Sequence, residues 1–133
     1  MRILAVGDIV GESGVRKLKE ELPRIKREEN IDFVITNGEN SAGGMGINER
    51  NFNDMLSAGT NVVTMGNHTW GKKDIFKFID HPQLLRPANY PKGVVGKGLA
   101  IDIVKAFLGA EFEGDRHIRR INKITEIEKK YSK

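Results

Sequence analysis

The sequence predicts an α/β fold: a three-layer α/β/α sandwich built on a mainly parallel sheet of about four strands. Three apolar, β-branched runs lie at residues 1–6, 32–36 and 61–65, and stretches with helical spacing separate them. Buried strands that alternate with helices are typical of parallel βαβ units. Polar residues follow each run, and ligands in such sheets bind beyond the carboxyl ends of the strands. We therefore expect one site at that edge of the sheet.

A fourth strand is expected within residues 84–90, which are extended around Pro87. Because βαβ crossovers are right-handed, the expected strand order is 3-2-1-4. The first helix is predicted from four apolar residues at helical spacing, Val15, Leu18, Leu22 and Ile25. Pro23 lies inside this pattern and should kink the helix or begin its second half.

A second helix is predicted after Asn48, which is a suitable N-cap, and it should end at Gly59. A short helix is expected at residues 73–79. Residues 94–133 form a second segment with two apolar helical faces, which we expect to pack with residues 1–93 as one domain. The first face consists of Leu99, Ala100, Ile103, Val104, Phe107 and Leu108, and the second is a narrow stripe of Ile118, Ile121, Ile124, Ile127 and Tyr131.

Composition excludes several classes of protein. The chain of 133 residues is long enough for one domain with a real core, and it contains no cysteine for disulfides or thiolate metal sites. No apolar run is long enough to span a bilayer, and no signal peptide precedes the first strand, so we expect a cytoplasmic protein. The net charge of +4 comes from basic residues mixed with glutamates, which argues against nucleic acid as the main partner.

Polar side chains follow the first three predicted strands: Asp8 after the first, Glu39 and Asn40 after the second, and Asn67 and His68 after the third. Carboxylate and amide oxygens bind divalent metals, and imidazole suits Mn, Fe or Zn. Paired metals activate water and clamp a phosphoryl oxygen. Each of these short stretches alone can be a simple turn or a helix cap, but three at successive strand ends indicate a shared site.

These motifs resemble those of the bacterial calcineurin-like metallophosphoesterases, which include cyclic-nucleotide phosphodiesterases. The resemblance covers residues 1–93 and rests on Gly7-Asp8-Ile9-Val10-Gly11, Asn37-Gly38-Glu39-Asn40-Ser41-Ala42-Gly43-Gly44, Met65-Gly66-Asn67-His68-Thr69-Trp70 and Leu84-Leu85-Arg86-Pro87-Ala88-Asn89-Tyr90-Pro91. It implies that Asp8, Glu39 and Asn67 are metal ligands, with Glu39 bridging. It also implies that Asn40 contacts the substrate phosphate and that His68 protonates the leaving oxygen or binds phosphate.

The metal site that this resemblance implies is incomplete. The family adds a later single histidine and a His-x-His pair, and this sequence has neither. Of its other histidines, His81 is expected on a surface loop and His117 lies in the second segment. Two or three ligands hold an ion weakly and do not fix two ions in catalytic geometry. We therefore expect weak or partial binding of Mn, Fe or Zn.

Residues 94–133 resemble a different family, the C-terminal end of the B-type ribose-5-phosphate isomerases. The resemblance is most specific from Phe112 to Lys123. It implies that the last helix crosses to a second subunit, giving a homodimer, and that Arg116, His117 and Arg120 bind phosphate. The base and the anion loop of that family lie in a part that is absent here, so isomerase chemistry is not expected.

Two unrelated pieces that meet near residues 90–96 suggest a chimera, and we favour an engineered recombinant over a natural fusion. The first hypothesis is a phosphoesterase-derived protein with a partial metal or phosphate site and little or no turnover. A second is a folding scaffold without activity. A third is an active metal-dependent phosphodiesterase whose missing ligands come from a partner subunit. Nucleic acid enters these hypotheses only as a cyclic-nucleotide or phosphodiester substrate.

Overall fold

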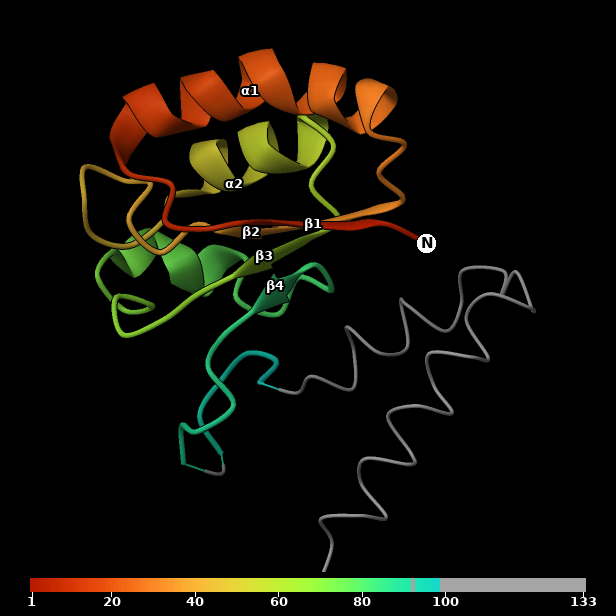
Figure 1. Ribbon diagram of the computed structural model, residues 1–133. Helices are drawn as coiled ribbons and strands as arrows, with labels where there is room; N and C mark the ends of the chain where they lie inside the picture. The colour runs from red at the N-terminus through yellow and green to blue at the C-terminus, as the bar shows by residue number, and fades with distance from the viewer. Residues whose placement is uncertain (92, 99–133) are drawn as a thin grey trace, which may run out of the picture.

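The structure is a computed structural model that describes residues 1–91 and 93–98 (Figure 1). Its elements in chain order are β1 (Ile3–Val6), α1 (Gly11–Glu28), β2 (Phe33–Asn37), α2 (Glu49–Ser57), β3 (Val62–Thr64), the 3-10 helix η1 (Lys73–Lys77) and β4 (Leu84–Leu85). The four strands form one sheet in which every neighbouring pair is parallel. The predicted α/β class with a parallel sheet of four strands is confirmed.

The predicted strand order 3-2-1-4 is wrong, because the observed order is β1-β2-β3-β4. Both full crossovers step in the same direction across the sheet, so α1 and α2 lie together over one face (Figure 1). The connection from β3 to β4 contains only η1 and no full α-helix. Such a short link sets β4 beside β3 rather than on the far side of β1. As a result β1 is an edge strand among the described residues.

Local sequence signals explain where the elements begin and end. Asn48 is the N-cap of α2, as predicted, and its side-chain oxygen accepts a hydrogen bond of 2.7 Å from the backbone N–H of Asn51. Pro23 lies inside α1, which continues through it to Glu28. The fourth strand is much shorter than the predicted 84–90 segment, because Pro87 has no N–H with which to continue a ladder.

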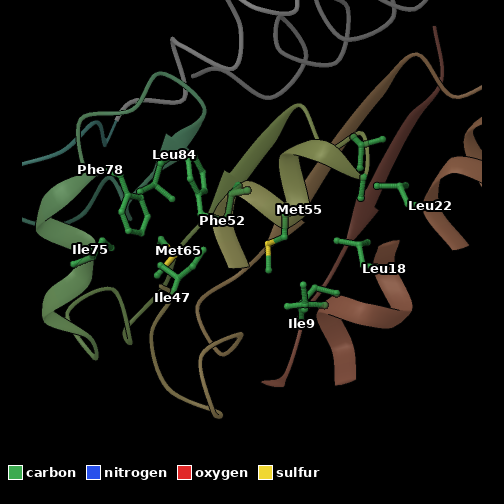
Figure 2. Close-up of a cluster of buried hydrophobic side chains, with 14 of the residues drawn as sticks. Ile9, Leu18, Leu22, Ile47, Phe52, Met55, Met65, Ile75, Phe78 and Leu84 are labelled. Carbon is green, nitrogen blue, oxygen red and sulfur yellow. The ribbon is translucent and has the colours of Figure 1, made fainter. Parts of the chain in front are cut away.

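The main core lies between the sheet and the helices. Register places Leu4, Val34, Val63 and Leu84 on the same face, and α1 and α2 pack against that face. Figure 2 shows the side chains that fill this layer, among them Leu18 and Leu22 of α1, Phe52 and Met55 of α2, and Ile75 of η1. This layer holds the strand ends in fixed positions, which is what a site at those ends requires.

The opposite face of the sheet is also apolar. Phe33, Val62 and Leu85 form a second buried cluster there, with Ile35 packed against it. Ile3, at the start of the edge strand, is 47% exposed. The helices predicted beyond residue 98, which would supply a further layer and the C-terminal amphipathic helix, lie outside the described residues. No helix within the described ranges is long and apolar enough to cross a membrane.

Candidate functional site

Four of the predicted site residues meet at one end of the sheet. Asp8 follows β1, Glu39 and Asn40 follow β2, and His68 follows β3, and the loops that carry them lie together in Figure 1. Hydrogen bonds join the three loops directly. Because β1, β2 and β3 are adjacent parallel strands, this convergence follows from the fold. The sequence prediction that these residues share one edge is therefore correct.

Asn40 is the central link of the cluster. Its amide Nδ2 donates a hydrogen bond of 2.6 Å to Asp8 Oδ1, and its Oδ1 lies 2.6 Å from Nδ1 of His68. The Asp8 carboxylate accepts only, so it fixes which end of the Asn40 amide faces each neighbour. The Asn40 oxygen must then accept from His68, which places the imidazole proton on Nδ1. This leaves Nε2 of His68 as the ring nitrogen free to exchange a proton with a ligand.

Glu39 is held against the backbone that follows β3. Its Oε2 accepts a hydrogen bond of 2.9 Å from the backbone N–H of His68. A Cβ atom added to Gly66 would lie 2.4 Å from both carboxylate oxygens of Glu39, so the glycine provides the space that the carboxylate occupies. The position of Glu39 thus depends on a glycine at residue 66.

Backbone hydrogen bonds fix the loop that carries Glu39 and Asn40. The carbonyl of Asn40 accepts from the N–H groups of Gly11 and Gly44, both at 3.0 Å. The buried Asn51 side chain of α2 donates at 2.8 Å to the carbonyl of Ser41. Since α2 is packed into the core, this contact ties the loop to a rigid element. The loop is therefore preorganised by the fold rather than by a ligand.

The two carboxylates of the cluster, Asp8 and Glu39, have no cationic partner within residues 1–91 and 93–98. Asp8 also adopts a left-handed backbone conformation, with φ of +40°, which non-glycine residues rarely adopt. Carboxylates without a compensating charge favour binding of a cation.

The donor set fits a divalent cation in part. Asp8 and Glu39 offer carboxylate oxygens, which hard cations prefer. In the part of the chain that the structure describes, however, no three side chains of His, Asp, Glu or Cys gather as a metal site requires. Asn67, predicted as a ligand, is exposed beside His68, and no hydrogen bond of its side chain joins it to the cluster within the described residues.

Two residues near the site were not predicted. Asn37 ends β2, and its side-chain oxygen is buried with no hydrogen-bond partner in the described structure. Such an orphaned acceptor is costly unless a donor or a cation reaches it. The signal in the sequence is a polar residue closing an apolar strand. Gly66 is the second of these residues. It matters because a side chain at this position would occupy the space of the Glu39 carboxylate, which the sequence does not show.

His81 lies in the loop between η1 and β4 and is partly exposed, in agreement with the predicted surface-loop position. Its ring packs edge-on against Phe52, with ring centroids 4.9 Å apart, and its Nδ1 accepts from the backbone N–H of Gln83 at 3.2 Å. These contacts give it a structural role at the start of β4. The phosphate-binding residues predicted in the second segment, Arg116, His117 and Arg120, lie outside the described residues, as does the predicted dimer helix.

The fold and the cluster define a parallel α/β protein with a polar site at the strand ends, and comparison with known proteins assigns the family. Residues 4–111 match the YmdB-like protein family, so the chain belongs to that family. The match extends beyond residue 93, where the phosphoesterase resemblance was expected to end. The N-terminal resemblance is confirmed at the level of the family, and the isomerase-like origin of residues 94–133 stays a prediction.

Curated and solved relatives agree with this assignment. The chain is 49% identical over 100 residues to a 2',3'-cyclic-nucleotide 2'-phosphodiesterase of Bacillus subtilis, a match of 74% of this chain and 38% of the relative. A hypothetical protein from Thermus thermophilus is 40% identical with a TM-score of 0.69, over 74% of this chain and 38% of that one. A phosphatase from Mycoplasma pneumoniae is 34% identical with a TM-score of 0.68, over 72% and 36% of the two chains. The chain thus spans little more than a third of these relatives.

Proposed function

We propose that this chain is a metallophosphoesterase-derived protein that binds one divalent cation weakly, together with a phosphate group, and turns over little or no substrate. The observation that carries the proposal is the cluster itself. Asp8 is joined through Asn40 to His68, which has a free ring nitrogen, and Glu39 accepts from the backbone N–H of the same histidine. Among the described residues, neither carboxylate forms an ion pair with a cationic side chain. That combination supplies a cation site and a proton donor side by side.

Asp8 and Glu39 would hold the cation, and Asn67 stays the third proposed ligand because it follows the same strand end as His68. The family resemblance implies Mn, Fe or Zn. Such an ion, when bound, polarises a phosphoryl oxygen and lowers the pKa of bound water. Binding is expected to be weak, since the described residues provide fewer protein donors than a closed site needs.

His68 would act on the phosphate ester. Its Nδ1–H is engaged by Asn40, so the proton that it could give to a leaving oxygen resides on Nε2 when the ring is protonated. The Asn40 amide donates one N–H to Asp8 and accepts from His68 through its oxygen, which leaves its second N–H to donate to a phosphate oxygen. We therefore assign Asn40 first to orienting His68, with phosphate contact as its second role.

The edge of β1, which pairs with no further strand among the described residues, supports the alternative, an active phosphodiesterase completed by a partner subunit. The outer edge of β1 borders a cavity of about 310 Å³ between this strand and α1, and Asp8 lies in its wall. Apolar side chains such as Leu4, Val6 and Leu18 line the rest. A second polypeptide that covered this edge would bring new ligands next to Asp8. The remaining hypothesis, a folding scaffold without activity, predicts no cation binding at all.

For the second segment, we propose a chimeric, isomerase-like tail that forms a homodimer. The support is the apolar stripe from Ile118 to Tyr131, which a two-fold contact would bury reciprocally. Arg116, His117 and Arg120 would then bind phosphate near the start of that helix. Truncation after Gly114 should abolish the dimer in light scattering. A monomer at high concentration for both chains would reject it.

The cation site is tested by calorimetric titration with Mn²⁺. The wild-type chain should bind at most about one ion per chain, and Glu39→Ala should abolish that binding. Glu21→Ala is the matched control, because Glu21 is a surface carboxylate already paired with Lys17 and Arg24. Tight binding of two ions, or an equal effect of the two variants, would contradict the proposed site.

Turnover is tested with a 2',3'-cyclic nucleotide and a bis-aryl phosphate in excess Mn²⁺. Hydrolysis by the full chain should stay near background, because catalysis needs both ions and the proton donor in place. Robust hydrolysis that is lost in both Asp8→Asn and His68→Ala would instead support the partner-completed enzyme.

A further inference from the structure

A row of aromatic rings extends from the candidate site to the surface. Trp70 stacks on Phe76 with ring centroids 5.6 Å apart and an interplanar angle of 18°. Trp70 also meets the ring of Tyr90 edge to face at 5.8 Å. We define these three residues, Trp70, Phe76 and Tyr90, as the aromatic wall. Nothing in the proposed cation site requires such a wall, so it calls for a separate explanation.

The inner end of the wall borders the site. The Tyr90 hydroxyl lies 3.5 Å from the carbonyl oxygen of Gly66, the residue whose Cα faces the Glu39 carboxylate. Trp70 follows His68 by two residues, so their Cα atoms are at most roughly 7 Å apart. Both observations place the rings within the length of a small organic ligand from the carboxylates.

The outer end of the wall is open to solvent. Phe76 is 59% exposed, whereas its neighbour Ile75 is fully buried in the core (Figure 2). The anchoring of Ile75 turns Phe76 outward. One face of the Phe76 ring is against Trp70, and the exposed remainder is free for a ligand. An exposed, stacked pair of this kind offers the flat apolar surface on which planar rings stack.

The third ring is held in place by a network behind it. The guanidinium carbon of Arg86 lies 5.9 Å from the centroid of the Tyr90 ring. Arg86 is itself fixed, since it donates hydrogen bonds to the carbonyls of Val94 at 3.0 Å and Gly96 at 3.1 Å. The wall is therefore preformed, and a ligand would not have to order it.

We propose that the aromatic wall stacks the nucleobase of a nucleotide whose phosphate lies at the Asp8, Glu39 and His68 cluster. This inference rests on the proposed function for the position of the phosphate, but the wall is defined by its own contacts. Stacking on aromatic rings tolerates any base, because every base has a flat π-face. The wall would therefore select nucleotides over simple phosphate esters without strong preference among bases.

Trp70 is the only tryptophan in the chain, so its fluorescence reports on the wall alone. The full chain is titrated in Mn²⁺ with adenosine 3'-monophosphate, and separately with ribose 5-phosphate and with inorganic phosphate. The nucleotide should quench Trp70 emission and bind about tenfold more tightly than ribose 5-phosphate. Equal affinity for the nucleotide and ribose 5-phosphate, with no quenching, would overturn the inference that the wall stacks a nucleobase.

Variants of Phe76 separate stacking from general apolar contact. Phe76→Ala and Phe76→Leu should each weaken nucleotide binding by about fivefold or more and leave the affinity for inorganic phosphate unchanged, whereas Phe76→Tyr should keep nucleotide binding. Ile3→Ala is the control, since Ile3 is an exposed apolar residue at the opposite end of β1. If Phe76→Ala leaves nucleotide affinity unchanged and instead reduces self-association, the wall is a protein contact and the inference is wrong.

The wall and the cation site fail in different ways. If Mn²⁺ and phosphate bind but the nucleotide binds no more tightly than phosphate, the inference that the wall stacks a nucleobase is wrong and the proposed function stands. If Mn²⁺ does not bind but adenosine still quenches Trp70 in a manner that Phe76→Ala weakens, the wall stands and the proposed function fails. If neither Mn²⁺ nor the nucleotide binds, both are overturned.

Discussion

Two groups of carboxylates in this protein differ in their partners. On α1, Glu20, Glu21 and Glu28 each form ion pairs with lysines or arginines of the same helix. At the strand ends, Asp8 and Glu39 accept only from an amide and a backbone N–H within the described residues. The first group is neutralised by basic residues of its own helix. The second has no compensating charge in the part of the chain that the structure describes.

This difference distinguishes surface charge from a binding site. Exposed i,i+4 pairs contribute little to stability and mainly keep a helix soluble. Uncompensated carboxylates whose positions are fixed by a packed fold are unfavourable for the empty protein and favourable for a cation complex. Three substitutions test whether the two groups of carboxylates differ in this way.

The largest effect is expected from Gly66→Ala. The new Cβ atom would lie 2.4 Å from both carboxylate oxygens of Glu39, so this flexible side chain has to move. The chain should fold normally, while Mn²⁺ affinity falls about ten- to a hundredfold, as for other changes that misplace a ligand. Calorimetric titration measures the affinity and urea unfolding measures the stability.

Gly7→Ala is the control for that change, because a Cβ atom at Gly7 meets nothing within 4 Å although the residue adjoins Asp8. It should leave Mn²⁺ binding unchanged. If both variants bind as the wild type does, the position of Glu39 is irrelevant to the cation and the contrast between the two carboxylate groups has no functional meaning.

An intermediate effect is expected from Asp8→Gly. Asp8 has φ of +40°, which glycine adopts without strain, so relief of the backbone should roughly offset the lost hydrogen bond to Asn40. We expect the free energy of unfolding to change by no more than about 0.5 kcal/mol, while Mn²⁺ affinity falls by about tenfold, because Glu39 stays in place. Urea unfolding and titration of the same preparation test both halves of the prediction.

Asn30→Gly supplies the comparison for Asp8→Gly. Asn30 follows the end of α1 with φ of +50°, far from the site, and glycine is the preferred residue there. This variant should raise the free energy of unfolding by about 0.5–1 kcal/mol and leave Mn²⁺ binding intact. A loss of more than about 1.5 kcal/mol in Asp8→Gly would show that Asp8 is structural rather than kept for a ligand.

The fold class could be predicted because strand burial and helical spacing are local signals. The runs at Ile3–Val6, Phe33–Asn37 and Val62–Thr64 were located to within a few residues, and the N-cap at Asn48 was identified. Strand order could not be predicted, since it depends on whether the third crossover contains a helix long enough to return across the sheet. The weak apolar pattern of η1 does not show how long the helix in this crossover is.

The candidate site shows the same division between local and long-range information. Chain position after a strand identified Asp8, Glu39, Asn40 and His68, because parallel strand ends must converge. It did not reveal that Asn40 joins Asp8 to His68, nor that Gly66 makes room for Glu39, since both depend on distances between separate loops. Asn67 also follows a strand end and is exposed, and its role as a ligand stays a prediction.

The smallest effect is expected from Glu21→Gln on the surface of α1. Hydrogen bonds from Lys17 and Arg24, together with their charges, lower the pKa of Glu21 from 4.5 to about 2. A carboxyl whose folded pKa is depressed stabilises the protein above its unfolded pKa, and this contribution is lost as the pH falls toward the folded value. The window is therefore about pH 4.5 to 2. The Glu21 side chain is 32% exposed, so water screens the interaction.

At pH 7 the melting temperature of Glu21→Gln should stay within about 3 °C of the wild type. Below pH 4.5 its melting temperature should fall less steeply than that of the wild type, because the glutamine has no proton to gain. Thermal unfolding followed by circular dichroism from about pH 7 to pH 2.5 measures both, with Mn²⁺ binding at neutral pH as the internal check. Unchanged acid sensitivity would mean that the α1 ion pairs are absent in solution. Altered Mn²⁺ binding would mean that the charges of α1 and of the strand ends are coupled, and the two carboxylate groups could no longer be treated as independent.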